Sequence, residues 1–203
     1  GETIFAGLRH ALGASNVVMA ATAAGIDVKR FDAVVLVIGE TPYAEVNGDL
    51  PPSDTLRHTS RYPEDLEALR TAAGRGVPII TVMLSGRPVY ANEVLNQSDA
   101  FVAAWLPGTE GGGVADLLVR KADGSVGFDF VGTLPFAWPV TDCPEKRQSL
   151  SRSSNFRFEV GYGLKYTMPS LVGLLPEDKR TGGCAAEHEL VVVDQFAQRP
   201  YGL

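Results

Sequence analysis

Two carboxylates follow the most apolar run in the first half of this chain. Residues 34–38 are all apolar, and Glu40 and Glu45 lie in the polar segment after them. A carboxylic acid can protonate a leaving group, and two carboxylates can together cleave a glycosidic bond, one as the acid and the other as nucleophile or base. Glu40 and Glu45 are therefore the first candidates for catalysis, although acidic residues in loops are most often only solvated.

The apolar run before these carboxylates predicts a strand that is buried on both faces. The segment after it, residues 40–59, holds three prolines and Gly48, and loops of this length inside a compact domain are usually functional. In open α/β sheets, ligands bind at the carboxyl ends of the strands. The loop that holds both glutamates is thus expected at the ligand-binding edge of a sheet.

The rest of the chain up to about residue 118 alternates between helix and strand patterns. Helical spacing predicts helices at 2–12, 63–73 and 111–118, with a short helix at 90–95, and apolar runs predict strands at 16–20, 78–84 and 100–106. The alternation predicts the α/β class, as a three-layer sandwich with a doubly wound, mainly parallel sheet. Beyond it, short strands are expected at 134–138 and 189–194.

Composition limits the classes of ligand. The chain has 203 residues, of which 45% are hydrophobic and 21% charged, with a formal net charge of −6. This size suits one domain with at most a short appendage, and the negative charge argues against nucleic acid or an anionic membrane surface as a partner. A neutral ligand such as a sugar is compatible. No apolar run approaches the ~20 residues of a membrane span.

Cysteine and histidine offer little chemistry. Cys143 and Cys184 are too few for a disulfide framework and lack metal-ligand spacing, so free thiols are expected, and pairing of the two stays open. His10, His58 and His188 have no second ligand at metal-binding spacing. The sequence therefore predicts no metal site.

Other candidates have simpler explanations. The glycines of residues 108–113 precede a predicted helix and suggest a phosphate site, but close packing of the backbone against a neighbouring strand is the preferred interpretation, because the P-loop and GxGxxG spacings are absent. Residues 85–87 do not form the GxSxG motif of a serine nucleophile. Arg87 could pair with a loop carboxylate, although a surface position is the default for an arginine. Trp105 and Trp138 are expected to pack in or around the core.

Five blocks of sequence resemble, in the same order, the glycoside hydrolases of family 3. They are IGETPYAEVNGD at 38–49, SGRPV at 85–89, SDAFVAAWLPGTEGGGVADLL at 98–118, GTLPFAWP at 132–139 and VGYGLKYT at 160–167. The resemblance extends over about residues 1–167 and is greatest to exo-acting β-glucan glucohydrolases and β-glucosidases.

The resemblance implies a division of labour between domains. In that family a barrel supplies an aspartate nucleophile, and a second α/β sandwich domain supplies the acid/base. This chain resembles the second domain alone, since a barrel needs about 250 residues. We expect the sandwich domain at residues 1–168, with its first strand upstream of the chain. Residues 169–203 are expected to be a linker and the start of a truncated further segment.

The resemblance also separates the two glutamates. The acid/base of the family lies in an E-x-x-G-D motif, which Glu45, Gly48 and Asp49 match. Glu40 is then expected to have a structural role at the base of the loop. Asp49 and Arg87 are weaker candidates for shaping the loop or contacting substrate. The implied chemistry is retaining hydrolysis of terminal β-linked glucose from a β-glucan or glucoside, without metal or organic cofactor, by a periplasmic or extracellular enzyme.

Two other classes remain as alternatives. A stand-alone module of doubly wound fold could bind a small ligand, a sugar or a nucleotide, at its strand ends. A structural or interaction domain would need no catalytic glutamate. If the first hypothesis holds, the chain by itself is expected to be inactive, because its nucleophile would come from the N-terminal barrel domain.

Overall fold

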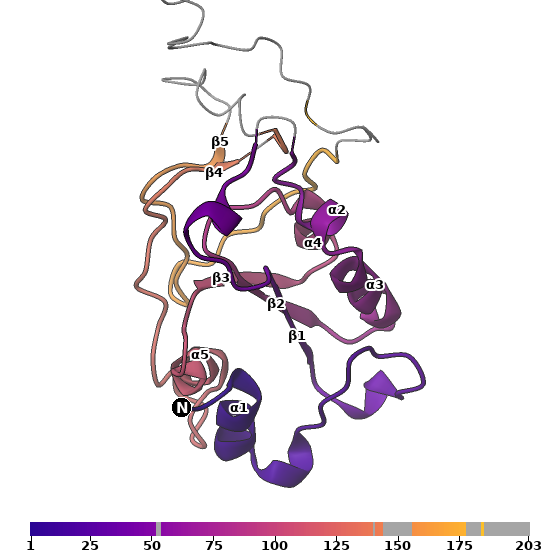
Figure 1. The fold of residues 1–203 in the computed structure, drawn as a ribbon. Coiled ribbons are helices and arrows are strands. Elements are labelled where there is room, and N and C mark those ends of the chain that lie inside the picture. The colour runs from indigo at the N-terminus through magenta and orange to yellow at the C-terminus, as the bar shows by residue number, and fades with distance from the viewer. Residues whose placement is uncertain (52–53, 140, 144–155, 178–183, 185–203) are drawn as a thin grey trace, which may run out of the picture.

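In the computed structural model, helices cover both faces of a three-stranded parallel sheet (Figure 1). The structure describes residues 1–203 except 52–53, 140, 144–155, 178–183 and 185–203, and it does not describe the side chains at 45, 46, 156 and 157. The strands β1 (Val34–Gly39), β2 (Ile79–Leu84) and β3 (Ala100–Trp105) lie in the order β1-β2-β3. The predicted α/β sandwich is thereby confirmed.

Each face of the sheet has its own helices and its own part of the core. Helices α1 (Ile4–Leu12) and α5 (Gly111–Leu118) cover one face, and α3 (Pro63–Ala72) and α4 (Asn92–Asn96) cover the other. Successive side chains of β2 point to opposite faces of the sheet, so this strand contributes to both parts of the core. Val82 packs with α1 and α5, whereas Ile79 and Met83 pack with α3 and α4. All three side chains are buried.

The longer helices form where the sequence predicts, although α1 begins at Ile4 and not at residue 2, and α3 ends one residue before the predicted end. The Thr3 side chain accepts a hydrogen bond from the backbone N–H of Ala6 at the start of α1, and Gly13 ends that helix with a φ of 90°. Helix α3 begins at Pro63, whose missing N–H costs nothing in the first turn. The shorter elements are η1 (Ala14–Asn16), η2 (Val28–Arg30), η3 (Glu45–Gly48), α2 (His58–Arg61), β4 (Trp138–Pro139) and β5 (Phe156–Phe158).

Two strand predictions were wrong at the same edge of the sheet. Strand β1 is not buried on both faces, since Val37 is 43% exposed. The predicted strand at 16–20 is absent, and Val18 and Met19 are exposed. Both differences have one cause: within the described ranges no strand pairs with the outer edge of β1, so that edge is open and residues 17–20 have no partner strand.

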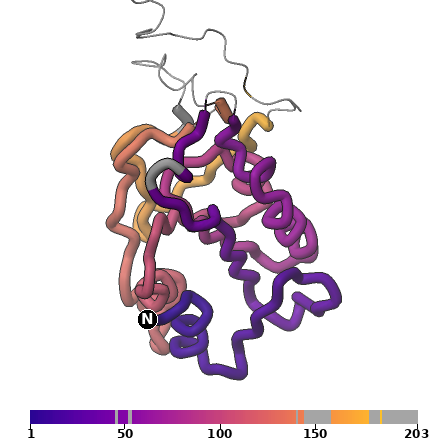
Figure 2. The backbone as a smooth tube through the Cα atoms, viewed as in Figure 1, coloured from indigo at the N-terminus to yellow at the C-terminus, as the bar shows by residue number. Residues whose placement is uncertain are grey.

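The regular alternation fades after α5, as expected. The strand predicted at 134–138 is reduced to the two residues of β4, which pair with β5 in antiparallel orientation. Residues 132–134 and 161–163 run side by side along the flank of the sheet (Figure 2), where the N–H of Leu134 donates to the carbonyl of Tyr162 and the N–H of Gly161 donates to Leu134. The strand predicted at 189–194 lies outside the described residues.

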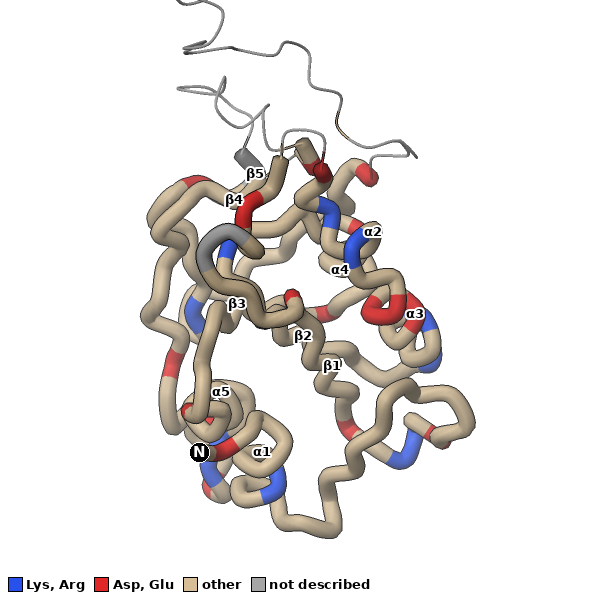
Figure 3. Tube along the Cα trace, viewed as in Figure 1, with Lys and Arg blue, Asp and Glu red and all other residues tan. Residues whose placement is uncertain are grey.

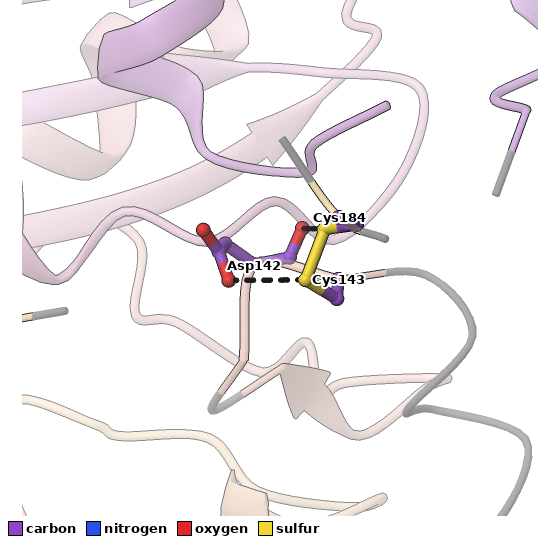
Figure 4. A group of neighbouring side chains, drawn as sticks. All are labelled: Asp142, Cys143 and Cys184. Carbon is purple, nitrogen blue, oxygen red and sulfur yellow. Dashed lines mark hydrogen bonds between the residues drawn. A yellow bond between two sulfur atoms is a disulfide. The ribbon is translucent and has the colours of Figure 1, made fainter. Parts of the chain in front are cut away.

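Cys143 and Cys184 form a disulfide, so the expectation of free thiols was wrong (Figure 4). Their Cα atoms are 5.4 Å apart although the cysteines are 41 residues apart in sequence. The sulfurs lie 3.5 and 3.7 Å from the Oδ1 and carbonyl oxygens of Asp142, and these are contacts only, because a disulfide has no thiol proton to donate. Both sulfurs are bonded to each other, so this group offers no thiolate to a metal.

Residues 175–177 are docked on α4. The side-chain amide of Asn96 donates to the carbonyl of Leu175 and accepts from its N–H, at 2.9 and 2.8 Å. Tyr90 and Asn92 both donate to the carbonyl of Pro176. The described part of the predicted linker therefore contacts the sandwich, while the boundary at residue 168 stays a prediction. None of the helices described is both long enough and apolar enough to cross a membrane.

Candidate functional site

The segments after the three parallel strands leave from one edge of the sheet. Pairing continues past the strand ends, because the N–H of Glu40 donates to Leu84 and the N–H of Ser85 donates to Trp105. Leu84 pairs with Trp105 across a register shift, and Trp105 has a φ of 53°, the only positive value among the described non-glycine residues. Such a bulged strand end is typical of the neighbourhood of a functional site.

Glu40 is the buried base of the loop that follows β1. Its side chain is 3% exposed. The Oε2 atom accepts hydrogen bonds from the Tyr43 hydroxyl at 3.0 Å and from the N–H of Gly86 at 3.3 Å, and Oε1 lies 3.5 Å from Nε of Arg87. These partners fix the carboxylate in a network that joins the loop after β1 to the loop after β2. The structure thus shows Arg87 paired with a loop carboxylate, the alternative to the default surface position.

Tyr43 is the centre of this network. Its hydroxyl donates to Glu40 and accepts a hydrogen bond from Nε of Arg87 at 2.8 Å, and the Arg87 guanidinium carbon lies 4.2 Å from the centre of its ring. Burial raises the pKa of the Tyr43 phenol above its ordinary value; the hydrogen bond from Arg87 opposes this rise, and Glu40 adds to it. Tyr43 is therefore protonated at neutral pH, as a donor to Glu40 must be.

Two glycines leave the space that the Tyr43 side chain fills. A Cβ atom at Gly48 would lie 2.7 Å from Cδ2 of the ring, and one at Gly86 would lie 2.6 Å from the hydroxyl. Both distances are too short for a real contact. Tyr43 therefore lies between the end of η3, which includes Gly48, and the loop after β2, which includes Gly86.

A second group of side chains holds the same loop from the helical side. The N–H of Gly39 donates to Oδ2 of Asp65 at 3.3 Å, and Nε2 of the fully buried His58 lies 2.7 Å from that oxygen. The N–H of Thr41 donates to the hydroxyl of Tyr62, whose ring stacks on His58. Residues 39–43 are thus attached both to the start of α3 and to the loop after β2.

The predicted acid/base residue lies just beyond this doubly attached segment. Glu45 is the first residue of η3, and its side chain lies outside the described part of the structure. Asp49 follows η3, is exposed, and has no side-chain partner among the described residues. The roles of Glu45 and Asp49 in catalysis or substrate contact, and that of Arg87 in substrate contact, stay predictions.

Sequence reasoning missed Tyr43, His58, Tyr62 and Asp65 as parts of this site. The signal for Tyr43 was present in its distance of three residues from Glu40, which suits a contact across a tight turn. The signal for His58 and Asp65 was weaker, because they are seven residues apart and Pro63 lies between them. The histidine without a metal ligand nearby proves to be paired with a carboxylate.

Packing explains two of the glycines of residues 108–113, Gly111 and Gly112 at the start of α5, but their neighbour is the start of α1 and not a strand, and Gly108 and Gly113 have no atom within 4 Å of an added Cβ. A Cβ atom at Gly111 would overlap the backbone nitrogen of Ile4, and one at Gly112 would overlap a carboxylate oxygen of Glu2. The N–H of Gly111 already donates to the carbonyl of Glu2. A carboxylate at this helix start disfavours the phosphate hypothesis.

A second buried set of charges lies near the disulfide. Arg57 lies over the Tyr90 ring, and its Nε is 3.4 Å from Glu93 and 3.8 Å from Asp142. Burial raises the pKa of Glu93, and the opposite charge of Arg57 only partly offsets this. The carbonyl of Asp142 also accepts from the N–H of Leu56, so this set supports the far end of the loop after β1.

Charged residues lie around the sheet and not within it (Figure 3). The three strands have no charged residue, and acidic and basic residues are interspersed over the surrounding helices and loops. The carboxylates of the site thus belong to the loops at the end of the sheet.

Comparison with known proteins gives a consistent result. The family model described as "Glycosyl hydrolase family 3 C-terminal domain" matches residues 2–166. A solved exo-1,3/1,4-beta-glucanase from a Pseudoalteromonas species is similar, with a TM-score of 0.77 and 38% sequence identity over 87% of this chain and 22% of that one.

Two curated proteins are also similar. The lysosomal beta glucosidase of Dictyostelium discoideum is 29% identical over 143 residues, which is 67% of this chain and 16% of that protein. The periplasmic beta-glucosidase of Salmonella typhimurium is 28% identical over 155 residues, which is 68% of this chain and 20% of that protein. This chain matches about a fifth of the length of these relatives.

Proposed function

Because this chain belongs to glycosyl hydrolase family 3, whose C-terminal domain it matches over residues 2–166, we propose that it supplies the catalytic acid/base to a retaining exo-acting β-glucosidase or β-glucan glucohydrolase. Glu45 is the proposed acid/base. The substrate is a glucoside or β-glucan with a terminal β-linked glucose. The aspartate nucleophile comes from an N-terminal barrel domain of the same protein.

The observation that carries this proposal is the position of Glu45 in its loop. Glu45 begins η3, directly after a segment at the carboxyl end of β1 that Glu40, Tyr43 and Asp65 hold in place. A general acid must be held within hydrogen-bond reach of the atom that it protonates, so an anchored loop suits this role better than a mobile one. The burial of Glu40 supports the assignment of the acid/base to Glu45.

The proposed reaction has two steps. Glu45 first protonates the leaving glucosyl oxygen while the nucleophile of the barrel attacks the anomeric carbon and forms a covalent glycosyl-enzyme. The Glu45 carboxylate then takes a proton from water, which attacks the same carbon and releases glucose. Retention of configuration requires the two carboxyl groups to lie about 5–5.5 Å apart. The chain by itself therefore has no glucosidase activity under this proposal.

The test is Glu45→Gln in the enzyme that includes the barrel. The variant is expected to lose about 10²- to 10⁴-fold in kcat/KM for phenyl β-glucoside, because phenoxide needs a proton to leave. The loss is expected to be small for 2,4-dinitrophenyl β-glucoside, whose leaving group needs none. Azide, which attacks the glycosyl-enzyme without a base, should raise kcat of the variant on the activated substrate and yield glucosyl azide.

Glu64→Gln is the matched control. Glu64 is an exposed glutamate in the first turn of α3, outside the site. This variant is expected to leave kcat/KM for both substrates unchanged. The proposal fails if Glu45→Gln retains wild-type activity on phenyl glucoside, or if the chain of residues 1–203 alone hydrolyses nitrophenyl glucoside and loses that activity on Glu45→Gln.

The alternative class is a stand-alone module that binds a sugar or a nucleotide. The packing of Gly111 and Gly112 against the start of α1 disfavours the nucleotide form. Calorimetry of the chain with glucose and with nucleotides separates the hypotheses, since tight binding of a nucleotide would favour the module.

A further inference from the structure

We propose that Tyr43 is a positioning residue for the acid/base: its hydroxyl and ring fix the loop so that Glu45 meets the leaving-group oxygen. The inference rests on the proposed function. It assigns a role to a residue whose side chain has a complete set of partners in the structure, and it makes this tyrosine part of the proton-transfer apparatus without contact to the substrate.

The first support is the way in which Tyr43 closes the loop on itself. Glu45 lies two residues after Tyr43 and three residues before Gly48. The Tyr43 ring packs against the backbone of Gly48. The short segment that contains Glu45 therefore begins at Tyr43 and ends at a residue in contact with the Tyr43 side chain. The backbone of Glu45 cannot shift along the loop unless the ring moves or Gly48 leaves it.

The second support is that the tyrosine is itself held from the other side. Its hydroxyl uses its proton for Glu40 and accepts one from Arg87, and both partners are largely buried. Arg87 and Gly86 belong to the loop after β2, which is hydrogen-bonded through Ser85 to the end of β3. The side chains of Tyr43, Glu40 and Arg87 therefore connect η3 to the end of the sheet, in addition to the loop backbone.

Loss of the hydroxyl has a defined consequence. In Tyr43→Phe, the partner left to Oε2 of Glu40 among the described residues is the N–H of Gly86, and Nε of Arg87 is left with its 3.5 Å contact to Glu40. The ring is then free to tilt, and η3 is free to follow it. A displacement of about 1 Å at a catalytic group can cost on the order of 10²-fold in rate.

The experiment measures kcat/KM of the barrel-containing enzyme on two substrates. Tyr43→Phe is expected to lower kcat/KM for phenyl β-glucoside by about 10- to 100-fold, and to change it less than about threefold for 2,4-dinitrophenyl β-glucoside, because only the first needs a well-placed acid. A loss of folding would lower both values equally. Equal losses, or no loss, overturn the inference.

Tyr166→Phe is the matched control. Tyr166 also has an arginine, Arg120, over its ring and also has its pKa raised by burial, but its hydroxyl donates to Leu117 at the end of α5, away from this loop. Tyr166→Phe is expected to leave the ratio of the kcat/KM values for the two substrates unchanged. A shift in that ratio as large as that of Tyr43→Phe overturns the inference.

One further variant, Gly86→Ala, and the comparison with Glu45→Gln distinguish the possible outcomes. If Tyr43→Phe does not fold, Gly86→Ala displaces the same hydroxyl, and a loss confined to phenyl glucoside is again expected, with equal losses overturning the inference. If Glu45→Gln shifts the substrate ratio and Tyr43→Phe does not, the positioning role alone fails. If Glu45→Gln leaves the ratio unchanged, the proposed function fails with it.

Discussion

A single tyrosine explains why glycine stands in the E-x-x-G-D motif of this chain. The Tyr43 ring occupies the space in which a side chain at position 48 would lie. Gly48 has no positive φ, so space and not backbone conformation makes glycine necessary. The sequence and the resemblance predicted that Glu45 and Gly48 belong together, but neither revealed what Gly48 faces, because a tertiary contact with an aromatic ring leaves no periodic pattern.

Gly48→Ala is therefore expected to displace Tyr43 or η3. Such overpacking typically costs about 1–3 kcal/mol of unfolding free energy, and we expect a loss in kcat/KM on phenyl β-glucoside of roughly 10-fold by misplacement of Glu45. Urea unfolding and the two-substrate comparison measure these effects. Gly132→Ala, at an exposed glycine with no atom within 4 Å of the new Cβ, is the control. Wild-type values for Gly48→Ala would contradict the contact.

Glu40 and Glu45 show how far residue types alone can be interpreted. Both were acids in one loop, and only the E-x-x-G-D spacing separated them. The structure adds that the Glu40 side chain is buried and has Tyr43, Gly86 and Arg87 as partners. The burial of Glu40 beside Arg87 depends on a loop about 46 residues further along the chain. A local sequence pattern around Glu40 therefore cannot predict this burial.

At the scale of elements, the longer helices were predictable, but the short helices η3 and α2 in the predicted loop of residues 40–59 and the sheet edge were not. Pro63 and Gly13 mark a helix start and a helix end by local backbone chemistry, so α3 and α1 lie where the sequence placed them. The burial of β1 depends instead on which strand lies beside it. Residues 17–20 show the same dependence, since apolar residues become a strand only when a partner is present.

The contact between α1 and α5 offers a test with two neighbouring glycines. Gly111→Ala is expected to lower the unfolding free energy by about 1–3 kcal/mol, because the new Cβ would meet backbone atoms of Thr3 and Ile4 that cannot rotate away. Gly113→Ala, in the same helix with open space around it, should instead stabilise by about 0.5–1 kcal/mol. Urea unfolding measures both, and equal effects of the two variants would contradict the packing.

At the scale of the whole molecule, the disulfide joins Cys184 to Cys143, whose neighbour Asp142 contacts the far end of the loop after β1. Cys184 is bonded to Cys143, and the neighbouring Asp142 holds the backbone of Leu56. Sequence alone left this pairing open, because one pair of cysteines far apart has no spacing signature. Residues 175–177, which the sequence presented as part of a linker, also return to contact α4.

Removal of the disulfide is expected to destabilise the chain. A closed loop of this length corresponds to about 4 kcal/mol of chain entropy in the unfolded state, and measured values are commonly about 2–4 kcal/mol. Cys143→Ser/Cys184→Ser should therefore unfold at lower urea concentration than the oxidised chain. Reductant should move the wild type to the same midpoint and leave the double variant unaffected. A wild-type curve that reductant does not move would contradict the cross-link.

Within the described part of the chain the outer edge of β1 has no partner strand, and this affects how the molecule can associate with other chains. A strand edge presents a row of backbone N–H and C=O groups that any extended segment can pair with, including the same edge of another copy. Val37, at that edge, adds apolar surface to the template. Association of the molecule with itself in solution thus depends on what covers this edge of β1, and any segment that pairs there would protect the molecule from aggregation.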